Sequence, residues 1–201
     1  MYHSGTTVGE LIVEMQEEVD VAGVIPASAY RRWITALETL IYSDILLFDR
    51  KASLTAQDGF LNISELSVGE GERTVLFDDV RKVYLDGEEL VRSGRVGAYQ
   101  FDDEKMIYYA DEDGIRVSVF GGGEDDDYDV IWRVVPAPKT ADADEVMLPV
   151  EWIDMVMARL RGEAYKVAND DEQAAKWLGD YNTQLASFRE WAAARGKRYG
   201  E

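Results

Sequence analysis

The densest group of side chains that could do chemistry is an acidic run in the second half of the chain. Three glycines at 121–123 precede five carboxylates: Glu124, Asp125, Asp126, Asp127 and Asp129. Carboxylate oxygens are the ligands that Ca²⁺ prefers, but an EF-hand loop needs alternating acids, a central glycine and a glutamate at its last position, which this run lacks. The pattern predicts a solvated hairpin loop, with adventitious Ca²⁺ or Mg²⁺ binding as the alternative.

The other candidate catalytic groups lack partners. Asp102 with Asp103, and Asp111 with Asp113, are spaced as the paired acids that glycosidases use, but each pair coincides with a turn signal that explains it. The single histidine, His3, lies in an unpatterned N-terminal stretch. No phosphate-binding loop motif occurs, and acids follow the glycine run where a lysine would be needed. We predict no catalytic residue, with a metal-dependent hydrolase built on the acidic run as the remaining enzymatic alternative.

Composition excludes several classes of protein. The absence of cysteine excludes disulfides, thiolate zinc sites and iron–sulfur clusters, and no cofactor or metal is predicted. The 40 acidic and 21 basic residues give a net charge of -19, which repels phosphate backbones and anionic lipids. No apolar run approaches the roughly 20 residues of a membrane span. We expect a protein that folds in the cytosol, is not exported, and neither reads nucleic acid nor enters a membrane.

Two further groups of residues have both a structural and a functional interpretation. Six aromatic residues could form a ligand-binding stack, but their helical spacing favours a packed core: Trp33, Trp152, Trp177, Tyr181, Phe188 and Trp191. The chain ends in a short basic stretch that stands out in an acidic protein: Arg195, Lys197 and Arg198, with Tyr199. This stretch is either a solvated end or an arm that orders on an acidic or polar partner surface.

The elements that must position these groups begin with two helices. Thr6 or Thr7 followed by Glu10 has the spacing of a capping box, and the apolar residues from Val8 to Val19 fall on one helical face. Residues 21–26 interrupt this pattern. A second apolar stretch, from Tyr30 to Phe48, is wide enough for a central packing helix.

From about Lys51 to Pro138 the pattern changes to short strands separated by turn signals. The candidate strands are 60–66, 80–85, 89–91, 106–110, 115–120 and 128–135. Asp86-Gly87 and Asp113-Gly114 are two-residue hairpin signals, because both turn positions require positive φ. These features predict a meander of antiparallel strands.

Helical periodicity returns after an exposed connector at 136–145. Pro149 is placed where the first turn of a helix tolerates proline, and 169–171 supply caps for a last helix. Because the terminal helices must share a core, we predict an α+β fold, a helical bundle with an inserted antiparallel β subdomain. The expected parts are the N-terminal helices at 1–50, the β subdomain at 51–138, the C-terminal helices at 139–194 and an arm at 195–201.

Two stretches, one near each end of the chain, carry the pattern of a known family. The first is Thr7-Val8-Gly9-Glu10-Leu11-Ile12, followed by residues 30–37. The second is Leu148-Pro149-Val150-Glu151-Trp152, followed by 161–166 and 170–181. Together they resemble the head-to-tail adaptor (head completion or connector) proteins of tailed bacteriophages, in which a helical bundle carries an inserted β domain. The β region of the chain matches that of the family only in its place between the helical segments and in being built of strands.

This resemblance implies a structural virion protein that is made in the host cytoplasm and lies in the neck between head and tail. It implies a homo-oligomeric ring of about twelve copies that docks under the portal, extends the DNA channel and carries the next tail or neck protein. It assigns portal binding to the arm of Arg195, Lys197, Arg198 and Tyr199. An acidic lumen, formed by the run from Glu124 to Asp129, would let DNA pass without specific binding. The alternative is an acidic monomeric or dimeric interaction module without a virion role.

Overall fold

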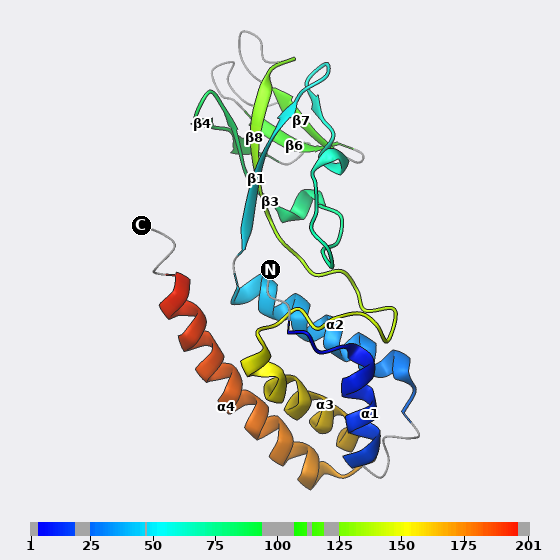
Figure 1. Cartoon of the computed structure of the whole chain (residues 1–201). Coiled ribbons are helices and arrows are strands. Elements are labelled where there is room, and N and C mark those ends of the chain that lie inside the picture. The colour runs from blue at the N-terminus through cyan, green and yellow to red at the C-terminus, as the bar shows by residue number, and fades with distance from the viewer. Residues whose placement is uncertain are drawn as a thin grey trace. The chain divides into compact units, whose positions relative to one another are not determined.

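The computed structural model describes residues 4–18, 25–46, 48–93, 107–111, 114–118 and 125–196. The chain forms two compact units, one from Met1–Leu46 with Pro136–Glu201 and the other from Leu47–Val135 (Figure 1). The first unit is helical and the second contains two four-stranded sheets. The predicted α+β class is confirmed.

The helical unit begins with the predicted capping box. The Thr7 backbone N–H donates to Glu10 Oε2 at 2.7 Å, and the Glu10 N–H donates to Thr7 Oγ1 at 3.2 Å. Helix α1 (Val8–Glu18) follows and buries the apolar face that the sequence indicated. Helix α2 (Ala27–Asp44) ends earlier than predicted, because the Phe48 carbonyl already accepts a hydrogen bond from Val134 N–H of the β unit.

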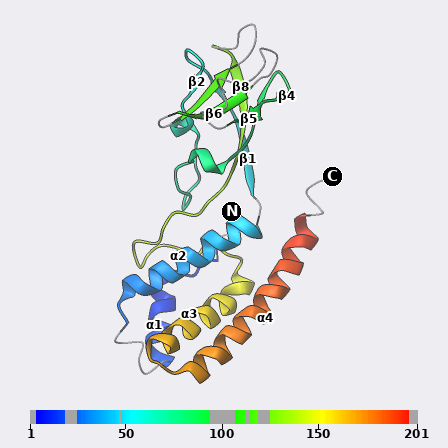
Figure 2. The same cartoon turned by 180° about the vertical axis from the view of Figure 1, so that it is seen from behind.

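Helices α3 (Ile153–Val167) and α4 (Asp171–Gly196) run side by side (Figures 1 and 2). Residues 150–152 form a 3-10 turn after Pro149, and the Asp170 carboxylate caps α4 by accepting from Gln173 N–H at 3.1 Å. The residues that α4 buries are spaced three or four or seven apart: Ala174, Tyr181, Leu185, Phe188 and Ala192. This heptad-like stripe is typical of two helices that pack lengthwise.

A buried ion pair joins α2 to the connector that precedes α3. Glu38 is fully buried, and its Oε2 lies 3.0 Å from Lys139 Nζ. Its Oε1 accepts from Met147 N–H at 2.6 Å, and Lys139 Nζ donates to the Glu145 carbonyl at 2.7 Å. The predicted exposed connector therefore includes one buried lysine that holds it against the helices.

The β unit consists of two sheets. The first has the order β1 (Asp49–Thr55), β8 (Asp127–Arg133), β3 (Val80–Leu85) and β4 (Glu88–Glu89), all antiparallel. The second has the order β2 (Phe60–Leu61), β7 (Gly114–Ser118), β6 (Ile107–Asp111) and β5 (Val91–Arg92). Short 3-10 turns cover 63–65 and 77–79. Both sheets contribute to one core, which includes Leu61, Val83, Tyr108, Tyr128 and Trp132.

The predicted meander is wrong. Strand β1, which the sequence did not single out, pairs with β8 far along the chain, and β5 pairs with β6 in parallel. The predicted strand at 60–66 is extended only at its first two residues before the 3-10 turn. The first hairpin signal is confirmed, with Asp86 at φ 51° and Gly87 at φ 85°. The second is wrong at Gly114, which pairs with Asp111 inside the ladder, and Asp113 lies outside the described residues.

Candidate functional site

The predicted acidic run lies partly in a strand and partly in the residues just before it. Asp127 and Asp129 lie in β8, Asp125 and Asp126 precede that strand, and Glu124 lies outside the described residues. Asp127 Oδ1 accepts from Thr55 Oγ1 at 2.5 Å, and Asp129 Oδ1 accepts from Ser53 Oγ at 2.7 Å. These two acids therefore bond to β1 and do not belong to a free loop.

Lysine also neutralises part of this acidic run. Lys51 Nζ lies 2.6 Å from Asp129 Oδ2, and the hydrogen bonds from Lys51 and Ser53 hold the pKa of Asp129 below its ordinary value. Asp125 Oδ1 accepts from Asp58 N–H at 3.3 Å. Within the described part of the chain, no group of three or more His, Cys, Asp or Glu is arranged to hold a metal ion. Asp127 and Asp129 bind side chains of β1, and Asp125 binds the backbone just beyond it.

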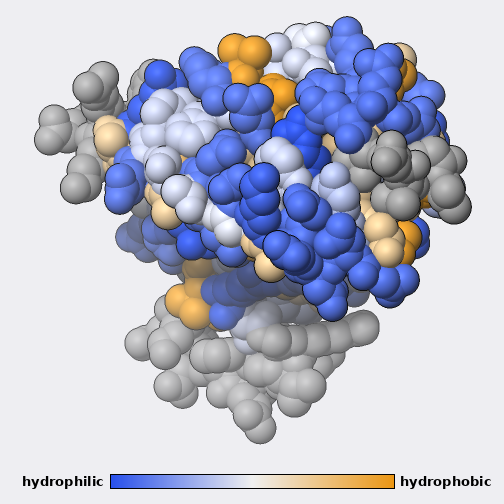
Figure 3. All heavy atoms as spheres, turned by 90° about the horizontal axis from the view of Figure 1, so that it is seen from below, coloured by the Kyte–Doolittle hydropathy of each residue, from blue (hydrophilic) through white to orange (hydrophobic). Residues whose placement is uncertain are grey.

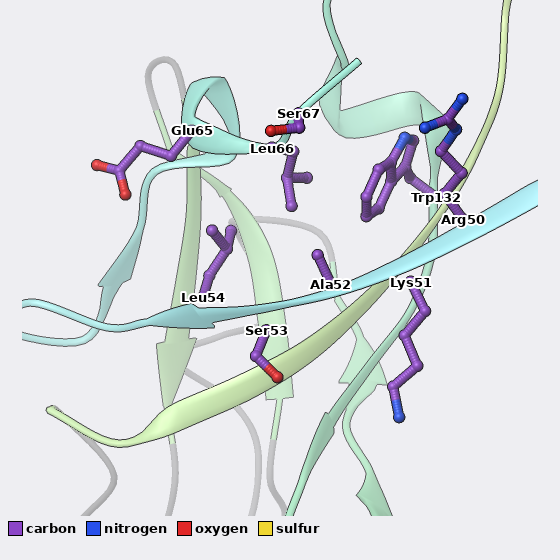
Figure 4. Close-up of a pocket in the computed structure, with 9 residues that line it drawn as sticks. All are labelled: Arg50, Lys51, Ala52, Ser53, Leu54, Glu65, Leu66, Ser67 and Trp132. Atoms are coloured by element: carbon purple, nitrogen blue, oxygen red, sulfur yellow. The ribbon is translucent and has the colours of Figure 1, made fainter. Parts of the chain in front are cut away.

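Beside this ladder lies a cavity of about 510 Å³ that the sequence did not reveal (Figure 4). Its apolar part is formed by Ala52, Leu54, Leu66 and Trp132. Arg50, Lys51 and Ser53 of β1, with Glu65 and Ser67 across the cavity, complete the lining. In Figure 4, Ala52 and Leu54 point toward Leu66, whereas Lys51 and Ser53 point to the other side of β1. The only available signal was the alternation of small and apolar side chains at 52, 54 and 56.

An ion pair fixes one end of this cavity. Arg50 lies 2.6 Å from Glu72 Oε1, and the Glu72 side chain is only 2% exposed. Glu72 Oε2 also accepts from Gly69 N–H at 2.8 Å. The turn at 69–72 is thereby held against the start of β1, where Arg50 lines the cavity.

The predicted portal-binding arm begins at the end of α4. Arg195 places its guanidinium 4.3 Å from the centre of the Trp191 ring, which stacks on Phe188 with a centroid distance of 5.4 Å. Lys197, Arg198 and Tyr199 lie outside the described residues. Of the six aromatic residues predicted to form a core, only Tyr181 and Phe188 are buried, and the four tryptophans are half-buried.

The face shown in Figure 3 is covered mostly by hydrophilic residues, and hydrophobic ones form small separate groups. Within the described residues, no helix is long and apolar enough to cross a membrane. Contacts made through the face in Figure 3 would therefore depend on polar and charged groups.

The sequence model of the SU10 adaptor protein family matches residues 6–200. The chain belongs to this family. The family is one of phage head-to-tail adaptors, so the resemblance found in the terminal helices is confirmed. A search of curated proteins finds no match to the chain.

Membership in the SU10 adaptor family points to a structural role in a bacteriophage. Its place is the neck of the virion, where it interacts with other phage head and tail proteins. The family match spans the β unit as well as both helical segments, whereas the resemblance seen in the sequence was carried only by the terminal helices. The cavity beside β1 is therefore part of the region that the family shares in sequence.

Proposed function

We propose that this chain is one subunit of a ring of about twelve copies that docks beneath the portal and joins the phage head to its tail. The observation that carries the proposal is the family match over residues 6–200. The ring would bind the portal on one side, offer the next tail or neck protein a platform on the other, and extend the DNA channel. Each of these tasks requires binding surfaces and no reaction.

The C-terminal arm is the proposed contact with the portal. Arg195 is held against Trp191 at the end of α4, and Lys197, Arg198 and Tyr199 follow directly in the sequence. Arg195, Lys197 and Arg198 are basic in a chain whose net charge is -19, so an acidic or polar portal surface would attract the arm and not the rest of the subunit. Arg195, which is anchored on Trp191, therefore precedes the three residues proposed to recognise the portal: Lys197, Arg198 and Tyr199.

The acidic surplus is proposed to act on passing DNA. A lumen that carries negative charge repels phosphate and keeps DNA from adhering to the wall. Because Asp127 and Asp129 bond to β1, Asp125 and Asp126, with Glu124, are the better candidates for such a surface. A ring whose lumen proved neutral or basic would contradict this part of the proposal.

Electron microscopy of the purified protein, alone and mixed with the portal ring from the same phage, tests the function. We expect a symmetric ring on the portal, and loss of binding when residues 197–201 are deleted. The matched control deletes only Gly200 and Glu201, which keeps the three recognition residues and should keep binding. If the full chain never joins the portal, the chain is better described as an acidic interaction module.

A further inference from the structure

Two arginines of the β unit, Arg81 and Arg133, have no acidic partner. In the part of the chain that the structure describes, no ion pair or side-chain hydrogen bond joins either of them to another residue. Nearly all the other described cations are in ion pairs or lie over aromatic rings, and the remaining exceptions, Arg32 and Arg189, lie on separate helices. In a chain with 40 acidic and 21 basic residues, two neighbouring arginines without an acid are unexpected.

Both arginines lie on the outer face of the first sheet. Buried residues alternate along β8, and Arg133 belongs to the alternate set that faces away from the core. In β3 the register shifts at residues 80–82, so that Arg81 and Lys82 are both exposed between the buried Val80 and Val83. A bulge of this kind redirects a side chain, and here it adds Arg81 to the outer face.

The strand register brings the two arginines close together. Because Val80 pairs with Trp132, Arg81 and Arg133 are diagonal neighbours across the β3–β8 pair, and such neighbours lie about 7–8 Å apart. Asp49 of β1 pairs with Arg133 on the other side of β8. Desolvation raises the pKa of Asp49, and the nearby Arg81 guanidinium opposes that rise. Two guanidiniums and one carboxylate therefore share this end of the face.

Arg133 carries a donor that the fold does not satisfy. Its Nε–H is buried, and no described group accepts a hydrogen bond from it. A buried donor without an acceptor destabilises a fold, so its presence calls for an explanation. A guanidinium presents five N–H donors in a planar fork that matches a carboxylate. An anionic ligand at this end of the face would give the Nε–H an acceptor.

We propose that Arg81 and Arg133 bind the carboxylates of an acidic segment in a virion protein other than the portal. The rest of the face selects the chemistry of that segment. Lys51 and Lys82 are already paired with acids of the chain, and Asp127 lies at the far end of β8. A segment that fits therefore places its acids at the two arginines and neutral or basic residues beyond them. This site leaves portal binding to the C-terminal arm and does not depend on the proposed ring.

A polypeptide fits this surface better than DNA does. A duplex carries one negative charge per about 1.7 Å of its axis. A duplex on the two arginines would therefore also meet Asp127 and Asp129 on the same face, in a chain whose net charge is -19. A polypeptide can group two or three acids where the arginines are and carry none elsewhere.

An NMR titration of the full chain tests the site. The probe is a peptide with three consecutive glutamates between glycine–serine ends, added at low salt. We expect it to shift the Nε–H resonances of Arg81 and Arg133, and to leave those of Arg32 and Arg189 unchanged. Unshifted resonances of Arg81 and Arg133, or equal shifts at all four arginines, would overturn the site.

Substitutions separate the arginine fork from its charge. Arg133→Gln should weaken binding of the peptide about tenfold or more, because hydrogen bonds to a charged group are lost. Arg189→Gln on α4 makes the same change in net charge and is the matched control, with unchanged affinity expected. Arg133→Lys keeps the charge without the fork, so its affinity should lie between the two. Equal affinities of the three variants would contradict the proposal.

Stability measurements show that these variants remain folded. Because Arg133→Gln removes a buried donor without an acceptor, its urea midpoint should be equal to that of the native chain or higher. Should this variant unfold, Arg81→Gln at an exposed position replaces it, and the same loss of affinity is expected. Full affinity in Arg81→Gln would then overturn the site.

Two further titrations decide the class of ligand. The peptide should bind several-fold more tightly than inorganic phosphate or a DNA duplex of about 12 base pairs. Tighter binding of the duplex, or equal binding of phosphate, would overturn the choice of an acidic polypeptide. In the portal mixture, the double variant Arg81→Gln/Arg133→Gln should still form the ring. A lost ring would assign the two arginines to the portal or to a second copy, and would overturn the choice of partner. Binding of the peptide by a chain that never joins the portal would refute the proposed function and leave this site intact.

Discussion

The ion pair between Glu38 and Lys139 makes the stability of the helical unit depend on one buried cation. Lys139→Met keeps most of the side-chain volume but leaves the fully buried Glu38 without its partner, and the Glu145 carbonyl loses a donor. Removing one member of a buried pair costs about 3–5 kcal/mol, because the remaining charge is unpaired. We expect the free energy of unfolding to fall by about 4 kcal/mol at pH 8.

The pH dependence of this loss has a definite sign. Burial raises the pKa of Glu38, and Lys139 opposes that rise, so the variant should have a still higher pKa in the folded state. An acid whose folded pKa exceeds its unfolded value favours folding at low pH, and this contribution is lost as the pH rises through the folded pKa. The deficit of Lys139→Met relative to the native chain should therefore shrink from pH 8 to pH 5.

Urea unfolding followed by circular dichroism at both pH values measures the deficit. Hydrogen exchange at the Met147 amide, which donates to Glu38 Oε1 at 2.6 Å, reports the same contact locally. Glu38→Gln combined with Lys139→Met keeps that acceptor without a charge, and should recover more than half of the loss. A deficit below about 1 kcal/mol at pH 8, or one that does not change with pH, would refute this account of the pair.

Four further substitutions have expected outcomes that unfolding or titration can measure. Glu10→Ala removes half of the capping box and should cost about 1 kcal/mol in urea unfolding. Gly162→Ala should destabilise by about 1–3 kcal/mol, because its Cβ would lie 2.7 Å from Leu178 Cγ. Gly179→Ala, with no atom within 4 Å, should stabilise by about 0.5–1 kcal/mol, and equal effects at the two glycines would contradict the packing. Because the pKa of Asp129 is lowered in the folded state, its carboxylate stabilises the fold at pH values above its unfolded pKa. This stabilisation is lost as the pH falls through the folded pKa. In Asp129→Asn the fall in the free energy of unfolding on acidification should therefore be smaller.

Local signals in the sequence predicted local structure well. The capping box at Thr7 and Glu10 and the turn at Asp86-Gly87 are each complete within four residues, and both occur as expected. Each depends on one hydrogen-bond pattern or one backbone conformation that few residue types satisfy. The capping box fixed the start of α1, and the turn joined β3 to β4.

Strand β1 escaped the sequence analysis for a physical reason. Among its residues only Leu54 is buried, and the alternating positions beside it carry small alanines, so the apolar alternation is too weak to identify a half-buried strand. Its stability comes instead from β8, whose Asp129 lies 76 residues from Ser53. Contacts at such separations leave little trace in a single sequence, and the cavity that depends on β1 was missed with it.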